Sequence, residues 1–479
     1  MFNGKIAAVL ISVVAASAVF VSCGENTVNG GEAVYDVTEY ASDDEILSGL
    51  SDQRYDGYNY RIFLRKDHLA TQYLEEDSED VVASAIYRRN KMVEERYGIT
   101  ITATESSSNN YDTDALNGIL AGDDAYDLIL PHGRASMAYA LQGVAYNIND
   151  ISTIDLDKPY WAKDLRDTFE IGGKMYFLDG DFSTQGLGSA MCILFNKRIF
   201  DELGYDYPYE TVKDGEWTFD EFAYLAKKGG KDLNGDGIMN PEDDSFGFYD
   251  SDWYGPIQVI YSGGQKICNK NDEGLLDLTL YSDKTVDIFD EFFNLMDNEN
   301  CFLNLTELAS TYNGNMFGEG RAMMMTAGLG SATSFRNMDD DFGIVPFPKY
   351  AEDDEYASIV NAYATIGIIP ITVSDVERTG AITEALCAYG SKEVIPAFYE
   401  VSLKTKSARD DESEEMMDII KDSIVYDIGY IAGGAFSSTG HSLARLSGHD
   451  FASFYATNRN AGLNYVEDFN RDYVGAAEE

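Results

Sequence analysis

The sequences RIFLR at residues 61–65, ITIT at 99–102 and YDLIL at 126–130 are three short strand-like runs that decide the fold class. Residues 81–97, which carry apolar residues at helical spacing, separate the first two runs, and a second helical stretch at 116–121 separates the last two. Strands that alternate with helices form a parallel sheet covered by helices. The sequence therefore predicts an α/β fold.

The N-terminus has the pattern of a secretion signal. Lys5 precedes an uncharged, mostly apolar run at residues 6–21, which is shorter than the ~20 residues of a membrane span. The run ends in FVSC at residues 20–23, which resembles the bacterial lipobox, whose cysteine is diacylated. We expect residues 1–22 to be a lipoprotein signal peptide and Cys23 to be the lipidated residue; an ordinary signal peptide with an incidental cysteine is the alternative.

Residues 23–57 are rich in acids and poor in large aliphatic side chains. Such a segment buries too little apolar surface to offset its ordering entropy, so we expect a flexible tether. The remaining length, about 420 residues, is enough for two domains or lobes with their own cores.

The chain has 83 acids, 35 bases and a net charge of -48. Nucleic-acid binding depends on clustered Lys and Arg at phosphates, so this composition argues against it. It also argues against attraction to anionic lipid, which leaves the acyl chain on Cys23 as the expected membrane anchor.

The other four cysteines show no CxxC or Cys/His metal spacing. Cys192 lies in an apolar run and Cys387 on a helical face, so both are expected in the core. Cys268 and Cys301 lie in polar contexts, and a disulfide between them stays open at this point.

Five local motifs occur in the order found in one family. They are AGDDAYDLI at 121–129, LFNK at 194–197, EWTFDE at 216–221, FGEGRAM at 317–323 and FGIVPFPK at 342–349. The third also offers a capping box, Thr218 and Glu221, for a helix that reaches Lys228. Together, behind a lipobox and a tether, the motifs resemble extracellular solute-binding proteins of bacterial ABC importers, in the carbohydrate, maltose-binding-like class.

The resemblance implies a type II periplasmic-binding-protein-like fold, with two hinge-connected α/β lobes and a ligand cleft between them. The first lobe would comprise residues 58–188 with about 359–402, and the second 189–358 with about 403–479. A carbohydrate, most simply an oligosaccharide, would close the lobes at the extracellular face of the cell membrane. The membrane permease subunits would then receive it, with no catalytic cofactor.

Sugar capture needs aromatic plates for the C–H face of the ring and polar groups for its hydroxyl rim. The segment DSDWYGP at 250–256 places Trp253 and Tyr254 among turn residues, where a core aromatic would be unusual. It also falls where the family places an aromatic of the second lobe. Both residues are cleft candidates, and a packing role is the alternative.

Two loops after strands supply further candidates. His132 and Arg134 follow the third strand, where ligands sit in open α/β sheets, although Pro131 replaces the aromatic that the family carries there. Lys66 and Asp67 follow the first strand and match a ligand-contact region of the family in position and type. A solvated loop is the alternative for His132 and Arg134.

Two glycine-rich turns fall at contact loops of the family. STQGLGS at 183–189 contributes Ser183 and Ser189, and AGLGS at 327–331 contributes Gly328 and Ser331. Tight turns without ligand contact are the alternative. Neither turn is followed by the Gly-Lys-Ser/Thr of a phosphate-binding loop.

Residues 232–243 (DLNGDGIMNPED) have the spacing of an EF-hand calcium loop. A glycine stands at position 6, and Asp243 replaces the usual glutamate at position 12. The expected ligands of a structural Ca²⁺ are Asp232, Asn234, Asp236, the Ile238 carbonyl, Asn240 and Asp243. A plain acidic turn is the alternative.

Two other functions are compatible with the composition. A surface glycoside-active enzyme needs two carboxylates, which 83 acids readily supply, although G-x-S-x-G and H-E-x-x-H are both absent. A sugar sensor or adhesin on the same fold would bind without transport. The order of the five motifs favours the transport protein.

Overall fold

The computed structural model describes residues 46–475 apart from 67, 69–71, 107–110, 164, 307–311, 313 and 404–410. Residues 43–479 form one compact unit. The predicted signal peptide, Cys23, most of the predicted tether and Asp67 lie outside the described residues.

Three parallel strands form the first sheet, in the order β2-β1-β3. They are β1 (Asn59–Leu64), β2 (Thr100–Glu105) and β3 (Leu128–Leu130). The helices α3 (Val81–Tyr97) and α4 (Tyr111–Leu120) alternate with them along the chain. The α/β class and the parallel pairing predicted from the three strand-like runs are confirmed.

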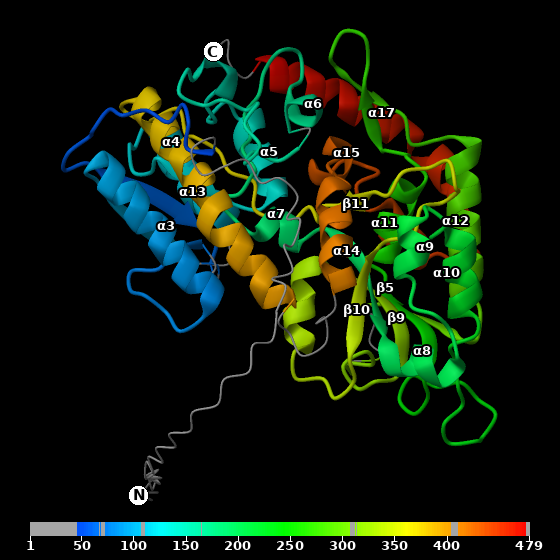
Figure 1. The fold of residues 1–479 in the computed structure, drawn as a ribbon. Helices are drawn as coiled ribbons and strands as arrows, with labels where there is room; N and C mark the ends of the chain where they lie inside the picture. The colour runs from blue at the N-terminus through cyan, green and yellow to red at the C-terminus, as the bar shows by residue number, and fades with distance from the viewer. Residues whose placement is uncertain are drawn as a thin grey trace, which may run out of the picture. The chain divides into compact units, whose positions relative to one another are not determined.

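The helix α13 (Val376–Leu403) returns from far along the chain and packs beside α3 (Figure 1). α3 begins after Asp80, whose carboxylate accepts a hydrogen bond from the Ala83 amide, and ends at Gly98 with φ 70°. The side chain of Arg89 on α3 is buried and donates to the backbone oxygens of Gln72 and Phe182. It thereby ties the helix to the segment that leads out of this sheet.

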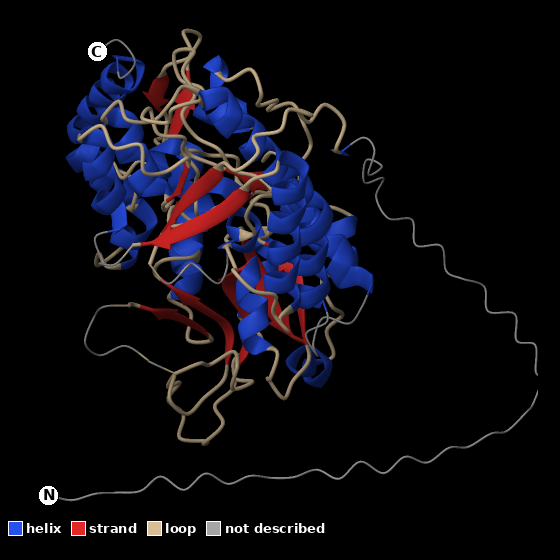
Figure 2. Cartoon of the chain, turned by 90° about the vertical axis from the view of Figure 1, so that its left-hand side faces the viewer, coloured by secondary structure: helices blue, strands red, loops and turns tan. Residues whose placement is uncertain are grey.

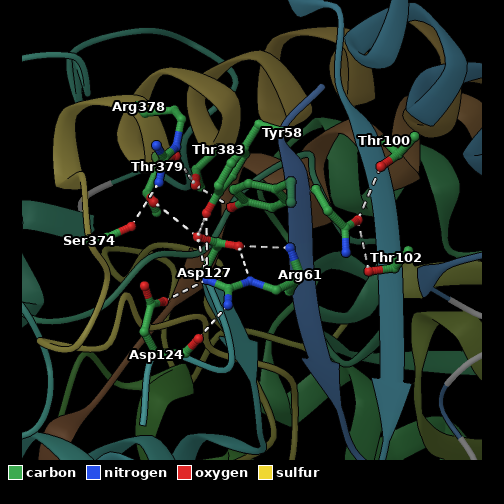
Figure 3. A network of polar contacts seen from close by, with 12 residues as sticks. Tyr58, Arg61, Thr100, Thr102, Asp124, Asp127, Ser374, Arg378, Thr379 and Thr383 are labelled. Atoms are coloured by element: carbon green, nitrogen blue, oxygen red, sulfur yellow. Dashed lines mark hydrogen bonds and ion pairs between the residues drawn. The ribbon is translucent and has the colours of Figure 1, made fainter. Parts of the chain in front are cut away.

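A buried carboxylate, Asp127, joins β1, β3 and α13 (Figure 3). It accepts hydrogen bonds from the amide of Arg61 at 2.8 Å and from its Nε at 2.9 Å. The Tyr58 hydroxyl also donates to it, and Thr379 on α13 lies at 3.5 Å. Arg378 covers the ring of Tyr58 at 3.6 Å. Asp127 of the motif AGDDAYDLI has a structural role, because it holds β1, β3 and α13 together.

The second sheet has five strands in the order β10-β4-β9-β5-β8. β5 is parallel to β8 and β9, whereas β4 is antiparallel to β9 and β10. The strands are β4 (Met191–Asn196), β5 (Phe246–Ser251), β8 (Cys301–Asn304), β9 (Ala322–Gly328) and β10 (Phe342–Pro346). β4 is buried along its whole length, as its unbroken apolar sequence indicates.

The four described cysteines are all free and buried. Cys192 and Cys387 lie in the core as predicted. Cys268 and Cys301, whose pairing the sequence left open, are not joined in a disulfide, and both thiols are buried at the starts of strands although polar residues flank them in the sequence.

The helix α10 (Phe219–Ala226) begins after Thr218, as predicted, but the Thr218 side chain makes no capping hydrogen bond. The predicted capping box is therefore not formed. Instead Trp217, which is fully buried, donates from Nε1 to the carbonyl of Pro346 at 3.0 Å. This hydrogen bond attaches the segment before α10 to the end of β10.

Residues 358–368 connect the two sheets. Val360 forms a bridge with Ala190, which precedes β4, whereas Ile368 forms a bridge with Ile129 of β3. β11 (Ser358–Ile359) in this segment pairs in parallel with β12 (Ile424–Val425), so a third part of the chain runs alongside. The segment at 358–368 therefore links the first and second sheets.

Helices flank the strands of both sheets (Figure 2). The remaining elements are η1 (Ile148–Asp150), η2 (Leu329–Phe335), β6 (Cys268–Lys270), β7 (Leu276–Leu278), α5 (Gly133–Leu141), α6 (Leu165–Phe169), α7 (Gln185–Gly188), α8 (Lys197–Leu203), α9 (Tyr209–Lys213), α11 (Gly255–Ser262), α12 (Asp283–Met296), α14 (Asp411–Asp422), α15 (Ile428–Ile431), α16 (Thr439–Ala444) and α17 (Phe451–Gly475).

Candidate functional site

A pocket of about 540 Å³ opens at the carboxyl ends of three neighbouring parallel strands. Ser251 ends β5, Asn304 ends β8 and Gly328 ends β9, and all three line it. Carboxyl ends of parallel strands are the usual place for ligands in open α/β sheets. The other lining residues are Gly188, Ser189, Met191, Tyr249, Trp253, Tyr254, Thr306, Ser331, Asn361, Tyr363, Ala364 and Tyr430.

Aromatic rings and neutral polar groups make up most of this wall. Trp253 and four tyrosines provide ring faces, and serine, threonine and asparagine side chains provide donors and acceptors. Burial raises the pKa of Tyr249 and of Tyr254, and raises the pKa of Tyr430 to about 12. Phenols are already protonated at neutral pH, and burial moves these three further from ionisation, so their hydroxyls can donate hydrogen bonds.

Five of the ten ligand residues predicted from the sequence lie together in this wall. They are Ser189, Trp253, Tyr254, Gly328 and Ser331. The glycine-rich turns allow two backbone segments to approach each other closely, because a Cβ on Gly328 would lie 3.0 Å from the carbonyl oxygen of Gly188. The two predicted turns therefore meet at the edge of the pocket.

The predicted pair after β3 lies behind the lining. The ring of His132 lies 5.2 Å from that of Tyr363, and the guanidinium of Arg134 lies 5.5 Å from the same ring. His132 also accepts a hydrogen bond at Nδ1 from the Ala135 amide, as the N-cap of α5. The two residues support an aromatic of the pocket.

Three other predicted residues are elsewhere. Ser183 lines a separate pocket of about 260 Å³ beside Asp179, whose pKa burial raises to about 7. Lys66 is half-buried and is not among the lining residues of the larger pocket. Asp67 lies outside the described residues.

Sequence reasoning missed Tyr363, which is 46% exposed and faces the pocket from the segment linking the sheets. Arg65 donates to its carbonyl at 2.8 Å. The sequence around it, SIVNAYATI at 358–366, mixes apolar and polar residues and gives no local signal of a binding wall. Asn304, Asn361 and Tyr430 were also missed.

A buried ion pair holds the loop that carries Trp253. Asp252 is fully buried and accepts a hydrogen bond from Arg445 Nε at 2.8 Å, and Nη2 of the same guanidinium lies 2.6 Å from the carboxylate as an ion pair. Its other oxygen accepts the Thr306 hydroxyl at 2.6 Å. Because Thr306 also lines the pocket, the pair fixes two parts of the wall at once.

The predicted calcium loop, residues 232–243, is an exposed turn whose acids bond backbone amides. Asp232 accepts from the amides of Gly235 and Gly237, and Asp236 accepts from that of Ile238. Within the described part of the chain, no three acid, histidine or cysteine side chains gather as metal ligands. The carboxylate oxygens keep further lone pairs, so a cation remains compatible with this turn.

The two linked α/β sheets and a pocket at strand ends, lined by rings and neutral polar groups, define a binding protein for small solutes. The family model of bacterial extracellular solute-binding proteins matches residues 83–374. The chain belongs to this family, as the five sequence motifs indicated.

Solved structures share the fold at low sequence identity. An ABC substrate-binding protein of Listeria monocytogenes in complex with cycloalternan is 15% identical with a TM-score of 0.52, covering 88% of this chain and 100% of that chain. The maltose/maltodextrin-binding domain of Bdellovibrio bacteriovorus bound to maltotriose is 14% identical with a TM-score of 0.51, over 88% and 100%. UgpB of Mycobacterium tuberculosis in complex with glycerophosphocholine is 15% identical with a TM-score of 0.55, over 86% and 98%.

A sequence search of curated proteins returned no significant match. Among the described helices, none has the length and apolar character needed to cross a membrane.

Replacing Arg445 by leucine is expected to destabilise the protein. The substitution leaves the carboxylate of Asp252 buried without its cation, which costs roughly 3 kcal/mol. Urea unfolding of the variant and the wild type measures the loss. Arg471→Leu is the matched control and should leave stability nearly unchanged, because Arg471 pairs with Asp468 and Asp472 at the surface. Equal stability of Arg445→Leu and the wild type would contradict the importance of the pair.

Proposed function

We propose that this protein captures a carbohydrate, most simply an oligosaccharide, in the 540 Å³ pocket and delivers it to the permease of a bacterial ABC importer. The observation that carries the proposal is the combination of ring faces and neutral hydrogen-bonding groups on one wall. Sugar rings present C–H faces to aromatic plates and hydroxyls to such groups. The proteins of similar fold that hold cycloalternan and maltotriose support the same ligand class.

The proposed protein binds its sugar without cleaving it, and this distinguishes it from a glycoside-active enzyme. Glycoside hydrolysis uses two carboxyl groups on either side of the scissile bond. Around Trp253 and Tyr363, the polar side chains among the described lining residues carry hydroxyl and amide groups, which bind sugar hydroxyls. A sugar sensor or adhesin would use the same wall, and uptake of labelled sugar by cells with and without the gene separates it from an importer component.

A panel of neutral oligosaccharides is expected to contain a ligand that raises the melting temperature, because binding to the native state stabilises it by mass action. Maltotriose, cycloalternan, cellotriose and xylotriose are suitable probes. Chromatography after incubation should return each sugar unchanged. Shortened products would instead favour the enzyme, and the absence of any shift would contradict carbohydrate capture.

Trp253→Ala should weaken binding of the best sugar by roughly 1 to 3 kcal/mol, through loss of a ring face and its buried area. Titration calorimetry measures the change. Trp161→Phe is a control for loss of an indole, since Trp161 is buried away from this pocket and donates to Glu384. Unchanged affinity in Trp253→Ala would assign Trp253 a packing role.

Lipid anchoring at Cys23 is a further part of the proposal, supported by the lipobox-like FVSC and by the family's extracellular location. Cys23→Ser should release the full-length protein from membranes into the soluble fraction, with sugar binding unchanged, because the described fold starts at residue 46. Cell fractionation and immunoblotting provide the measurement. Continued sedimentation with membranes would contradict the anchor.

The calcium proposal rests on the spacing of residues 232–243, which carry Asp232, Asp236 and Asp243 at positions 1, 5 and 12 of an EF-hand-like loop, in a chain of charge -48. A cation would relieve their repulsion. Calcium should therefore stabilise the protein by about 1 to 2 kcal/mol through linkage. The comparison is thermal unfolding in EGTA and in millimolar calcium, for the wild type and Asp236→Ala. Identical wild-type melting in both solutions would refute a calcium site.

A further inference from the structure

The indole of Trp253 is covered on one side by an imidazole. The ring centroids of Trp253 and His441 lie 3.6 Å apart, and the two planes are inclined by 22°. His441 belongs to the short helix α16, and Trp253 to the loop after β5. Two segments far apart in the sequence therefore form one stacked pair at the pocket wall.

The helix that carries His441 is itself tightly held. His441 and Arg445 are four residues apart, so they project from the same side of a helical turn. Arg445 bonds the buried carboxylate of Asp252, and His441 Nδ1 lies 3.3 Å from the Asp252 carbonyl oxygen. Gly440 allows α16 to pack closely on the start of α11, because a Cβ there would lie 1.7 Å from the carbonyl oxygen of Pro256.

The stacked face of the indole is closed to ligand. Trp253 is half-buried and lines the pocket, so a ligand can reach only what the imidazole leaves exposed. A tryptophan side chain that was free to change rotamer would lose that freedom when a sugar ring packed on it. The imidazole removes this cost before the ligand arrives.

We propose that His441 is a positioning residue for ligand binding: it stacks on Trp253 and fixes the plane of the indole that meets the sugar. The inference rests on the proposed carbohydrate function. It adds a role for the C-terminal segment, which the family resemblance places in the second lobe without any part in the site. His441 acts through Trp253 and needs no contact with the ligand.

The test measures the affinity of the best oligosaccharide from the panel for three variants. His441→Ala removes the stacked ring and should weaken binding roughly 3- to 10-fold. His441→Leu keeps much of the volume without a flat face and should also bind weakly. His441→Phe restores a flat ring and should bind within about twofold of the wild type. Weak binding by the Phe variant, or wild-type binding by the Ala and Leu variants, would overturn the proposal.

His449→Ala is the matched control, since His449 is stacked on Phe293 with centroids 4.3 Å apart and neither ring lines the pocket. It should leave affinity unchanged. A similar loss in this control would mean that affinity follows general stability, and would overturn the positioning role.

A ligand-free readout separates this inference from the carbohydrate function. Subtracting the near-ultraviolet circular dichroism of Trp253→Phe from that of the wild type isolates Trp253, because Trp161 and Trp217 are buried elsewhere. The difference band should shrink in His441→Ala and return in His441→Phe. If no sugar binds the wild type, the carbohydrate function fails, whereas an unchanged band in His441→Ala overturns the positioning role by itself.

Discussion

The two-sheet arrangement depends on the hydrogen bonds that the buried carboxylate of Asp127 accepts. It bonds Arg61 on β1, precedes β3 and approaches Thr379 on α13, so it joins segments from both ends of the chain. After the first sheet, the chain forms the second sheet and then returns, so that α13 packs beside α3 on the first sheet. A buried carboxylate with several donors is costly to expose or to leave unpaired. It therefore favours the packing in which α13 lies against the first sheet.

The pocket follows from that return. Because α13 belongs with the first sheet, the segment at 358–368 must pass from β4 to β3, where it bridges Ala190 and Ile129 through Val360 and Ile368. This passage carries Tyr363 across the carboxyl ends of β5, β8 and β9. The linking segment therefore forms part of the binding wall, and a motion of one sheet relative to the other would change the wall directly.

The parts that sequence predicted well are local ones. The helix at 81–97 follows from apolar residues at helical spacing, and the buried position of Cys192 follows from the apolar run around it; both appear as expected. Trp253 was found because turn residues surround it. Tyr363 was not, because its exposure depends on a crossing between sheets that no local pattern encodes. The capping box at Thr218 failed for a similar reason: the tertiary anchor of Trp217 on Pro346 sets the entry to α10.

The charge of the chain and the character of the pocket are separate properties. A net charge of -48 lies mostly on exposed acids, whose fields are screened within about 8 to 10 Å at physiological salt. Near the pocket, Asp252 is compensated by Arg445, and Arg134 lies against the ring of Tyr363. Burial raises the pKa of Tyr249, Tyr254 and Tyr430 still further above neutral pH than that of a free phenol, so these hydroxyls carry no charge. Affinity at this wall must therefore come from ring contact and neutral hydrogen bonds. Both weaken steeply with misalignment, so the groups that hold each ring in its plane matter as much as the rings.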